Sequence, residues 1–293
     1  RIGVANGQNT GLAEVQYVRN DLPALVATVT SDDTGVADLI TLPDSASPVT
    51  VTIEPGQYLS STTVAGGGVA LEPIGAGTAN ISARIPGSWT VLPLADQSVT
   101  VTAPGISIQD RTVAAGLQHG VLRSTLGATD HPGVTVRLES ADPAVMLVST
   151  SASEAGTPFV DVPVATGSSA VDYWVHGVDG HTGDVLLRVS APGFVSDSAT
   201  ISVVEAAYEI LGLDVTTNTF AADDPLWVRV GVPYAANQSL QVVQARRAGQ
   251  PPLDLTVTSS NPGAGLLTTP STPQVPSVSV PIPTGPAQPP PSR

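Results

Sequence analysis

The chain has 293 residues, a formal net charge of −14, no cysteine, and 11 basic residues that are all arginine. A surface this acidic excludes binding to nucleic acid or to an anionic membrane, because both need clustered basic side chains to displace counterions. Aromatic residues make up 4% of the chain, so its cores must be aliphatic, and no segment combines helical spacing with a helix cap. We therefore predict an all-β protein.

The sequence of residues 1–103 predicts short antiparallel strands separated by Gly- and Pro-containing turns. In the segment ANISARI, Ala79 and Ile81 share one face while Asn80 and Ser82 share the other, as a half-buried strand requires. The remaining apolar segments of this region alternate in the same way. The expected strands are 25–30, 49–53, 69–71, 78–85 and 98–102.

The sequence of residues 104–206 predicts a complete immunoglobulin-like sandwich. Seven segments of alternating apolar and polar residues follow one another there, with turn residues between them. We expect Val136 and Leu138 of the second strand to meet Leu187 of the sixth across the core. The expected strands are 106–113, 134–139, 146–149, 159–164, 170–175, 184–190 and 199–204.

A repeated sequence pattern divides the chain into three modules. An apolar run, a polar turn and a second apolar run recur at 25–42, 134–150 and 253–269, separated by offsets of 109 and 119 residues. This period is the size of a whole small β domain. We therefore predict tandem immunoglobulin-like β-sandwich modules at 1–103, 104–206 and 207–293, of which the first and last are incomplete.

The incompleteness follows from a second internal match. Arg1-Ile2-Gly3-Val4 aligns with Arg229-Val230-Gly231-Val232, and the match continues to Arg19 and Arg247. The first module thus lacks an equivalent of the segment 209–228. The third module has strands at 253–258 and 277–282 and then a Pro-rich tail, for which an extended polyproline conformation is expected.

Two explanations of the partial modules remain open. The chain is a piece of a longer array, or the partial modules complete each other between copies by addition of a strand from 209–228. Left unpartnered, the apolar side chains of strands 253–258 and 277–282 would face water. We therefore favour assembly, in which other copies of the chain are the partners and the contacts propagate end to end.

The closing strands of the first two modules resemble a known family. GDVLLRVSAPGF (183–194) followed by SATISVV, and GTANISARIPG (77–87) followed by SVTVT, are similar to the closing strands of bacterial immunoglobulin-like (Big) repeats. Those repeats resemble the tandem domains of invasin- and intimin-type surface proteins. The resemblance implies an extracellular or cell-surface location and a role as stalk, adhesin, surface-layer part or enzyme spacer.

Residues that could bind a metal form no recognised motif. All four histidines, His119, His131, His176 and His181, lie in the middle module. His176 and His181 flank a turn beside Asp179 and Asp184, but their spacing matches no ligand pattern, and we interpret these two as solvated loop side chains. Calcium at module junctions is the more reasonable alternative, although no EF-hand loop occurs. We expect no cofactor. The acidic residues expected near junctions and turns are Asp32, Asp33, Asp110, Asp142, Glu205, Glu209, Asp214, Asp223 and Asp224.

Catalytic signatures are also lacking. Ser168 and Ser169 are not in a Gly-x-Ser-x-Gly elbow, so we predict no enzymatic activity. Asn80-Ile81-Ser82 and Asn237-Gln238-Ser239 match the N-glycosylation acceptor pattern, with Asn80 expected to point outward.

These observations predict an extracellular structural protein that forms a stalk, surface filament or surface layer. Two alternatives remain: an adhesin whose loops bind a glycan or host protein, and an accessory stalk of a secreted polysaccharide-degrading enzyme. Sugar sites stack aromatic rings on their ligands, and the tryptophans Trp89, Trp174 and Trp227 do not occupy matching positions in the three modules. This scatter favours the structural interpretation.

Overall fold

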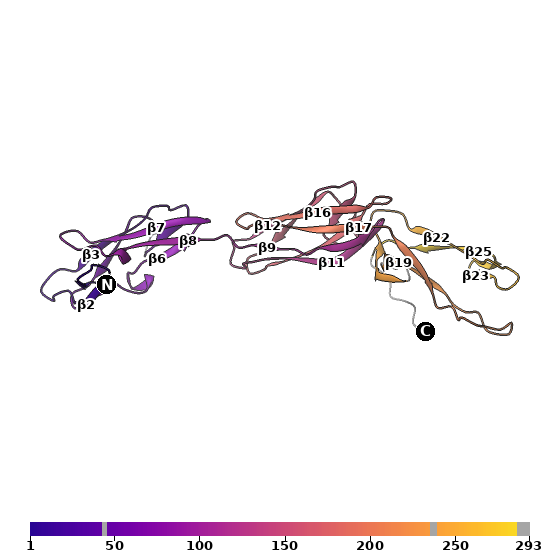
Figure 1. The fold of residues 1–293 in the computed structure, drawn as a ribbon, viewed down its shortest axis with the longest axis horizontal. Coiled ribbons are helices and arrows are strands. Elements are labelled where there is room, and N and C mark those ends of the chain that lie inside the picture. The colour runs from indigo at the N-terminus through magenta and orange to yellow at the C-terminus, as the bar shows by residue number, and fades with distance from the viewer. Residues whose placement is uncertain (43–45, 235–238, 286–293) are drawn as a thin grey trace. The chain divides into compact units, whose positions relative to one another are not determined.

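The computed structural model describes residues 1–42, 46–234 and 239–285, and it is all-β as predicted. The chain forms two compact units, Arg1–Ala103 and Pro104–Arg293, which are described separately (Figure 1). Helical turns within the described residues are the 3₁₀ segments η1 (Val64–Gly66) and η2 (Pro93–Ala95). No described helix has the length and apolar character needed to cross a membrane.

The first unit is built around a four-stranded antiparallel sheet in the order β5-β3-β7-β8, with a second pair, β4-β6. Its main core cluster contains Ala27, Val29, Leu39, Val49 and Val51. The predicted alternation holds along β7, where Ala79 is buried and Asn80 is exposed. The strands are β1 (Gly3–Ala5), β2 (Leu12–Val15), β3 (Leu25–Ser31), β4 (Ala37–Ile40), β5 (Val49–Ile53), β6 (Ala70–Pro73), β7 (Gly77–Arg84) and β8 (Asp96–Val101).

The second unit begins with a sandwich of two five-stranded sheets. One sheet has the order β10-β17-β16-β12-β14. The other has the order β13-β15-β11-β21, with β9 beside β11, and its strand β21 (Ala245–Arg246) comes from the segment that follows residues 104–206. A single apolar cluster fills the space between them and includes the fully buried Leu138 and Leu187. The strands are β9 (Ile106–Ser107), β10 (Arg111–Ala114), β11 (Leu117–Leu126), β12 (Val134–Ser140), β13 (Met146–Ser149), β14 (Phe159–Val164), β15 (Ala170–Gly177), β16 (Gly183–Ser190) and β17 (Asp197–Val204).

Two details of the predicted sandwich are wrong. The segment 106–113 is two short strands, β9 and β10, which join different sheets. The strands β12 and β16 do not face each other across the core but are hydrogen-bonded neighbours in one sheet, with Leu138 opposite Val189. The side chains across the core come instead from the other sheet, which includes β11, a ten-residue strand absent from the prediction.

The rest of the second unit adds three small sheets. They are β18-β19-β20, β22-β25 and β23-β24. The expected exposure of the strands at 253–258 and 277–282 is wrong: Val257 and Val278 are each 9% exposed, and Leu255 and Ile282 are half-buried against neighbouring strands. The strands are β18 (Ala207–Leu211), β19 (Trp227–Pro233), β20 (Leu240–Val243), β21 (Ala245–Arg246), β22 (Leu253–Thr258), β23 (Leu267–Thr269), β24 (Thr272–Val275) and β25 (Ser277–Ile282).

The match between residues 1–19 and 229–247 is also a structural repeat. Gly3 pairs with Val15 in the first unit, and Gly231 pairs with Val243 in the second, 228 residues later. Both hairpins shift register at the same place, between Val4 and Ala5 in the first unit and between Val232 and Pro233 in the second. A Cβ at Gly3 would lie 2.0 Å from the carbonyl oxygen of Glu14, and a Cβ at Gly231 would lie 2.0 Å from that of Val242. Glycine is therefore required at the same point of both hairpins for the same steric reason.

Candidate functional site

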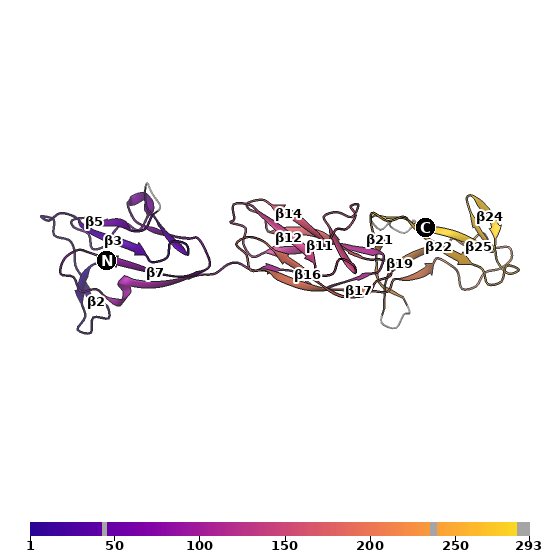
Figure 2. The same cartoon turned by 90° about the horizontal axis from the view of Figure 1, so that it is seen from above.

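An extended polar network forms the junction that joins the sandwich 104–206 to the strands that follow it. Figures 1 and 2 show β19 at one end of this sandwich. Gln244 lies there and is 4% exposed. Its side-chain Nε2 donates to the carbonyl of Thr112 at 3.0 Å, and its Oε1 accepts from the amide of Ala114 at 2.9 Å. One glutamine thus satisfies a donor and an acceptor of the buried β10 edge, as a buried amide must.

A second glutamine makes a similar bridge in the opposite direction. Gln118 of β11 is 4% exposed; its Nε2 donates to the carbonyl of Ala152, and its Oε1 accepts from the amide of Ala248, both at 2.8 Å. Because Gln244 and Gln118 come from opposite sides of the junction, each part of the unit supplies a side chain that completes the backbone bonding of the other. Such bonds fix register as well as distance.

Two arginines and one aspartate close the same junction. Arg246 and Arg247 are 7% and 8% exposed, and both bind the carboxylate of Asp179, which lies in the turn between β15 and β16. Arg246 also donates to the carbonyl of Gly116 at 2.8 Å. Burial acts to raise the pKa of Asp179, but hydrogen bonds from Arg246 and Arg247 outweigh it and hold that pKa below its ordinary value.

Gly116 makes this arrangement possible. Its φ is +76°, and a Cβ there would lie 2.6 Å from Nη1 of Arg246 and 2.7 Å from Oδ1 of Asp179. Any other residue would be strained and would displace the ion pair. Beneath the polar layer, Ala114, Leu117, Val230 and Val232 form a buried apolar cluster, so the junction combines aliphatic packing with a satisfied polar network.

Sequence reasoning did not identify this junction. The match between residues 1–19 and 229–247 pairs Gln16 with Gln244 and Arg19 with Arg247. The match does not indicate that Gln244 and Arg247 are buried. The usable signal was the run Gln244-Ala245-Arg246-Arg247, because two adjacent arginines are unusual in a chain with 11 basic residues. Their partner Asp179 had been considered as a metal neighbour of His176 and His181.

The structure separates those two histidines. His176 is fully buried on β15, where its Nε2 lies 2.8 Å from Oγ of Ser149, whereas His181 is exposed and contacts the carbonyl of Asp179. Burial, with Arg247 nearby, lowers the pKa of His176 to about 4. The Ser149–His176 pair resembles a nucleophile and base, but Ser149 is 2% exposed and His176 is 0% exposed, so no substrate can reach it.

Three of the acidic residues considered for calcium, Asp32, Asp110 and Asp142, accept hydrogen bonds from the protein. Asp32 accepts from the backbone amide and the side-chain amide of Asn80 at 2.7 and 2.8 Å, and these bonds, backbone first, lower its pKa. Asp110 accepts from the amide of Thr200 at 2.7 Å, and Asp142 accepts from that of Ala144 at 3.1 Å. Within the described residues, no three acidic, histidine or cysteine side chains gather as a metal would require.

The remaining candidates lie on the surface. Asn80 is exposed as expected, although its amide is engaged by Asp32; Asn237 lies outside the described residues. Trp89 is 42% exposed, and Trp174 and Trp227 are half-buried on strands of the second unit.

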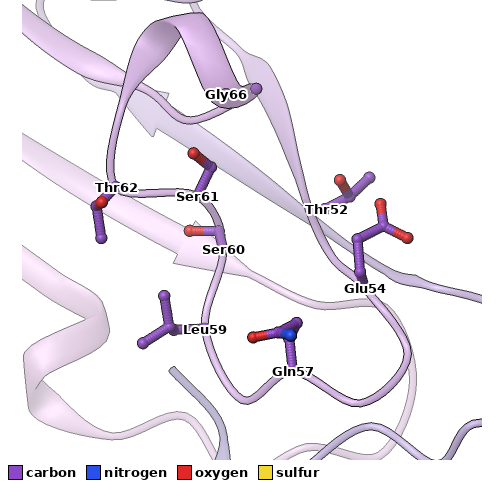
Figure 3. Close-up of a pocket in the computed structure, with 9 residues that line it drawn as sticks. Thr52, Glu54, Gln57, Leu59, Ser60, Ser61, Thr62 and Gly66 are labelled. Atoms are coloured by element: carbon purple, nitrogen blue, oxygen red, sulfur yellow. The ribbon is translucent and has the colours of Figure 1, made fainter.

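A shallow hollow of about 360 Å³ lies in the first unit (Figure 3). Hydroxyl side chains of the loop 59–62 lie on one side of it, and Thr52 and Glu54 lie on the other. Ser61 Oγ is already bonded to the carbonyl of Thr63 at 3.1 Å. The described lining contains no aromatic ring, so it offers no stacking platform for a sugar. The lining residues are Thr52, Glu54, Gln57, Leu59, Ser60, Ser61, Thr62, Gly66 and Gly67.

The fold and the junction define a class: an all-β chain of tandem sandwich modules. No protein-family model matches the sequence, and no curated protein matches it significantly. Among solved structures, the chain is similar to domains 4–9 of the surface layer protein SbsC, with 17% identity and a TM-score of 0.28, covering 88% of this chain and 33% of that one.

Two further solved structures are similar at the same level. Domains 4 and 5 of SbsC show 16% identity and a TM-score of 0.24, covering 61% of this chain and 76% of that one. A tetra-tandem repeat from the extending region of a large adhesion protein shows 18% identity and a TM-score of 0.25, covering 89% and 59%. At these values we draw no functional inference from the likeness.

Proposed function

We propose that this chain is an extracellular structural repeat protein, the body of a stalk, surface filament or surface layer. It works by holding modules in fixed relation to one another, without catalysis and without a cofactor. The observation that supports this proposal is the junction of the second unit. There, Gln244, Gln118 and Arg246 tie two parts of the chain together through buried side-chain bonds rather than through a flexible linker.

The physical reason is that a stalk must resist bending at each boundary between modules. A linker rich in Gly and Ser would behave as a random coil and transmit little force. A boundary with a buried apolar cluster and a satisfied polar network has one geometry, because any rotation leaves buried polar groups unpaired. The acidic surface, with a net charge of −14, keeps separate chains apart until specific contacts form.

The lack of cysteine makes a direct test of stiffness simple, because spin labels can be introduced at chosen positions. Thr166→Cys and Ser260→Cys place exposed labels on the two sides of the junction. A rigid junction gives a narrow distance distribution, as narrow as that of a control pair placed within 104–206. A broad distribution between residues 166 and 260 would contradict the proposed function.

The finer part of the proposal is that copies of the chain contact one another end to end. Sedimentation velocity over a range of concentrations, with electron microscopy of the same samples, tests this part. We expect elongated species that lengthen with concentration. A monomer at all concentrations would exclude self-assembly. The proposed stalk function would then be supported by the junction of the second unit alone.

A further inference from the structure

The first unit carries the same docking face that the second unit uses at its junction, but there the face is uncovered. The two faces are equivalent because β1-β2 and β19-β20 share register, the position of the register shift and the required glycine. The turn bonds match as well: Asn6 donates to the carbonyl of Gly11 at 2.9 Å, and Tyr234 donates to that of Ser239 at 2.9 Å.

Burial differs sharply between equivalent positions. Val232 is 3% exposed under the junction, whereas its counterpart Val4 is 46% exposed. Gln244 is 4% exposed, whereas Gln16 is exposed. A face that packs and hydrogen-bonds in one copy of the repeat is therefore presented to solvent in the other, within the residues that the structure describes.

The charged position of the face shows the same contrast. Arg247 is buried and binds Asp179 across the junction, through Nε at 2.8 Å. Its counterpart Arg19 has a side chain that is 72% exposed and pairs with Asp21, two residues along the same exposed turn. An exposed ion pair of this kind contributes little stability and exchanges readily for a better-placed carboxylate.

We propose that the face formed by Val4, Gln16 and Arg19 is a docking surface for an immunoglobulin-like module built like residues 104–206. The chemistry of the partner follows from the covered copy of the face. Gln16 fits an edge strand that offers a backbone carbonyl and a backbone amide two residues apart, as Thr112 and Ala114 do. Arg19 fits a carboxylate in a turn, as Asp179 provides. Val4 fits an aliphatic cluster.

This inference rests on the proposed function, because it assumes that modules of this chain are joined by fixed junctions. The test is a chain in which residues 1–228 precede a complete chain 1–293. The bond from Val228 to the second Arg1 then reproduces the native bond from Val228 to Arg229. In the leading copy, the module 104–206 still follows residues 1–103. Its end that contacts β19 and β20 in the complete chain is free, and it is available to the face formed by Val4, Gln16 and Arg19 in the trailing copy.

Amide hydrogen exchange at residues 16–19 is the readout. We expect exchange at the trailing copy of these residues to slow about tenfold or more relative to the unfused chain, approaching that at 244–247, since buried hydrogen bonds protect the segment. Gln16→Ala in the trailing copy should remove the protection. Gln97→Ala, at an exposed glutamine outside the repeated face, is the matched control and should not.

A charge reversal gives an independent measurement. Arg19→Asp in the trailing copy should abolish protection, and adding Asp179→Arg in the leading copy should restore it if the two side chains meet. Unchanged exchange at 16–19 with normal protection at 244–247 overturns the docking surface and leaves the proposed function intact. Fast exchange at 244–247 in the unfused chain would overturn the proposed function itself.

Discussion

Replacing Gly116 by alanine is the sharpest test of the junction. The substitution adds one methyl group to a residue whose φ is +76°, at a point where that methyl would lie 2.6 Å from Nη1 of Arg246 and 2.7 Å from Oδ1 of Asp179. The backbone must either leave the left-handed region or force the guanidinium and the carboxylate apart. Both responses loosen the contact between the sandwich 104–206 and the strands that follow it.

The magnitude has two parts. Holding alanine in the left-handed region costs about 1–2 kcal/mol. Separating a buried arginine from its partner costs about 3–5 kcal/mol when both groups are buried, and the Asp179 side chain is 43% exposed, so we discount this part to about 1–2 kcal/mol. The expected total is about 2–4 kcal/mol, of which the second part acts at the junction.

The assay is amide hydrogen exchange at residues 244–248, combined with urea unfolding. Gly167→Ala is the matched control, because Gly167 has a φ of +84° and a Cβ there would meet no atom within 4 Å. Each 1.4 kcal/mol corresponds to a tenfold change, so Gly116→Ala should accelerate exchange at 244–248 about tenfold. The control should leave that exchange unchanged. Equal effects of the two substitutions would refute the steric account of Gly116.

Three further predictions follow from burial and hydrogen bonding. Leu187→Ala should lower the free energy of unfolding by about 2–5 kcal/mol in urea melts, whereas Leu186→Ala, at a side chain 43% exposed, should change it by less than about 0.5 kcal/mol; equal losses would mean that the inward face is misassigned. The pKa of His176 is about 4 in the folded state against 6.5 for an unperturbed histidine, so the unfolded chain takes up a proton first as the pH falls. Stability should therefore drop by up to about 3 kcal/mol between pH 6.5 and pH 4, and His176→Gln should flatten this dependence; an unaltered pH profile of the variant would contradict the assignment. Chelation with EDTA should leave the calorimetric unfolding temperature unchanged, because Asp32 and Asp110 already accept backbone hydrogen bonds, and a marked fall on chelation would show a bound cation.

Local patterns in the sequence determined much of the β structure. Alternation of apolar and polar residues placed the strands at 49–53, 146–149, 159–164, 253–258 and 277–282 at the bounds that the structure gives. Alternation works there because one face of each strand packs on a core and the other meets water or a neighbour. The internal match also aligned the two segments that form the repeated hairpin, including Gly3 with Gly231, although no hairpin was predicted there.

The longest strand was hidden from the sequence for a physical reason. In β11, the buried face includes the polar Gln118 and Ser124, while Val121 is 61% exposed, and a register shift interrupts the strand after His119. The polar side chains are tolerated inside because each has a hydrogen-bond partner, such as Ser124 with the carbonyl of Ser107 at 3.0 Å. Alternation of residue types therefore no longer reports burial.

The junction, too, was decided by tertiary structure. Gln16 and Gln244 are the same residue type at equivalent positions of the repeated segments 1–19 and 229–247, yet Gln244 is buried and Gln16 is exposed. What differs is the neighbour: Ala114 of the β10 edge is 130 positions from Gln244 along the chain, and Asp179 is 68 positions from Arg247. The sequence by itself determined many of the strands and the segments that repeat, because those properties depend on local pattern. Which repeated faces are covered depends on contacts between distant segments, and only the folded chain shows them.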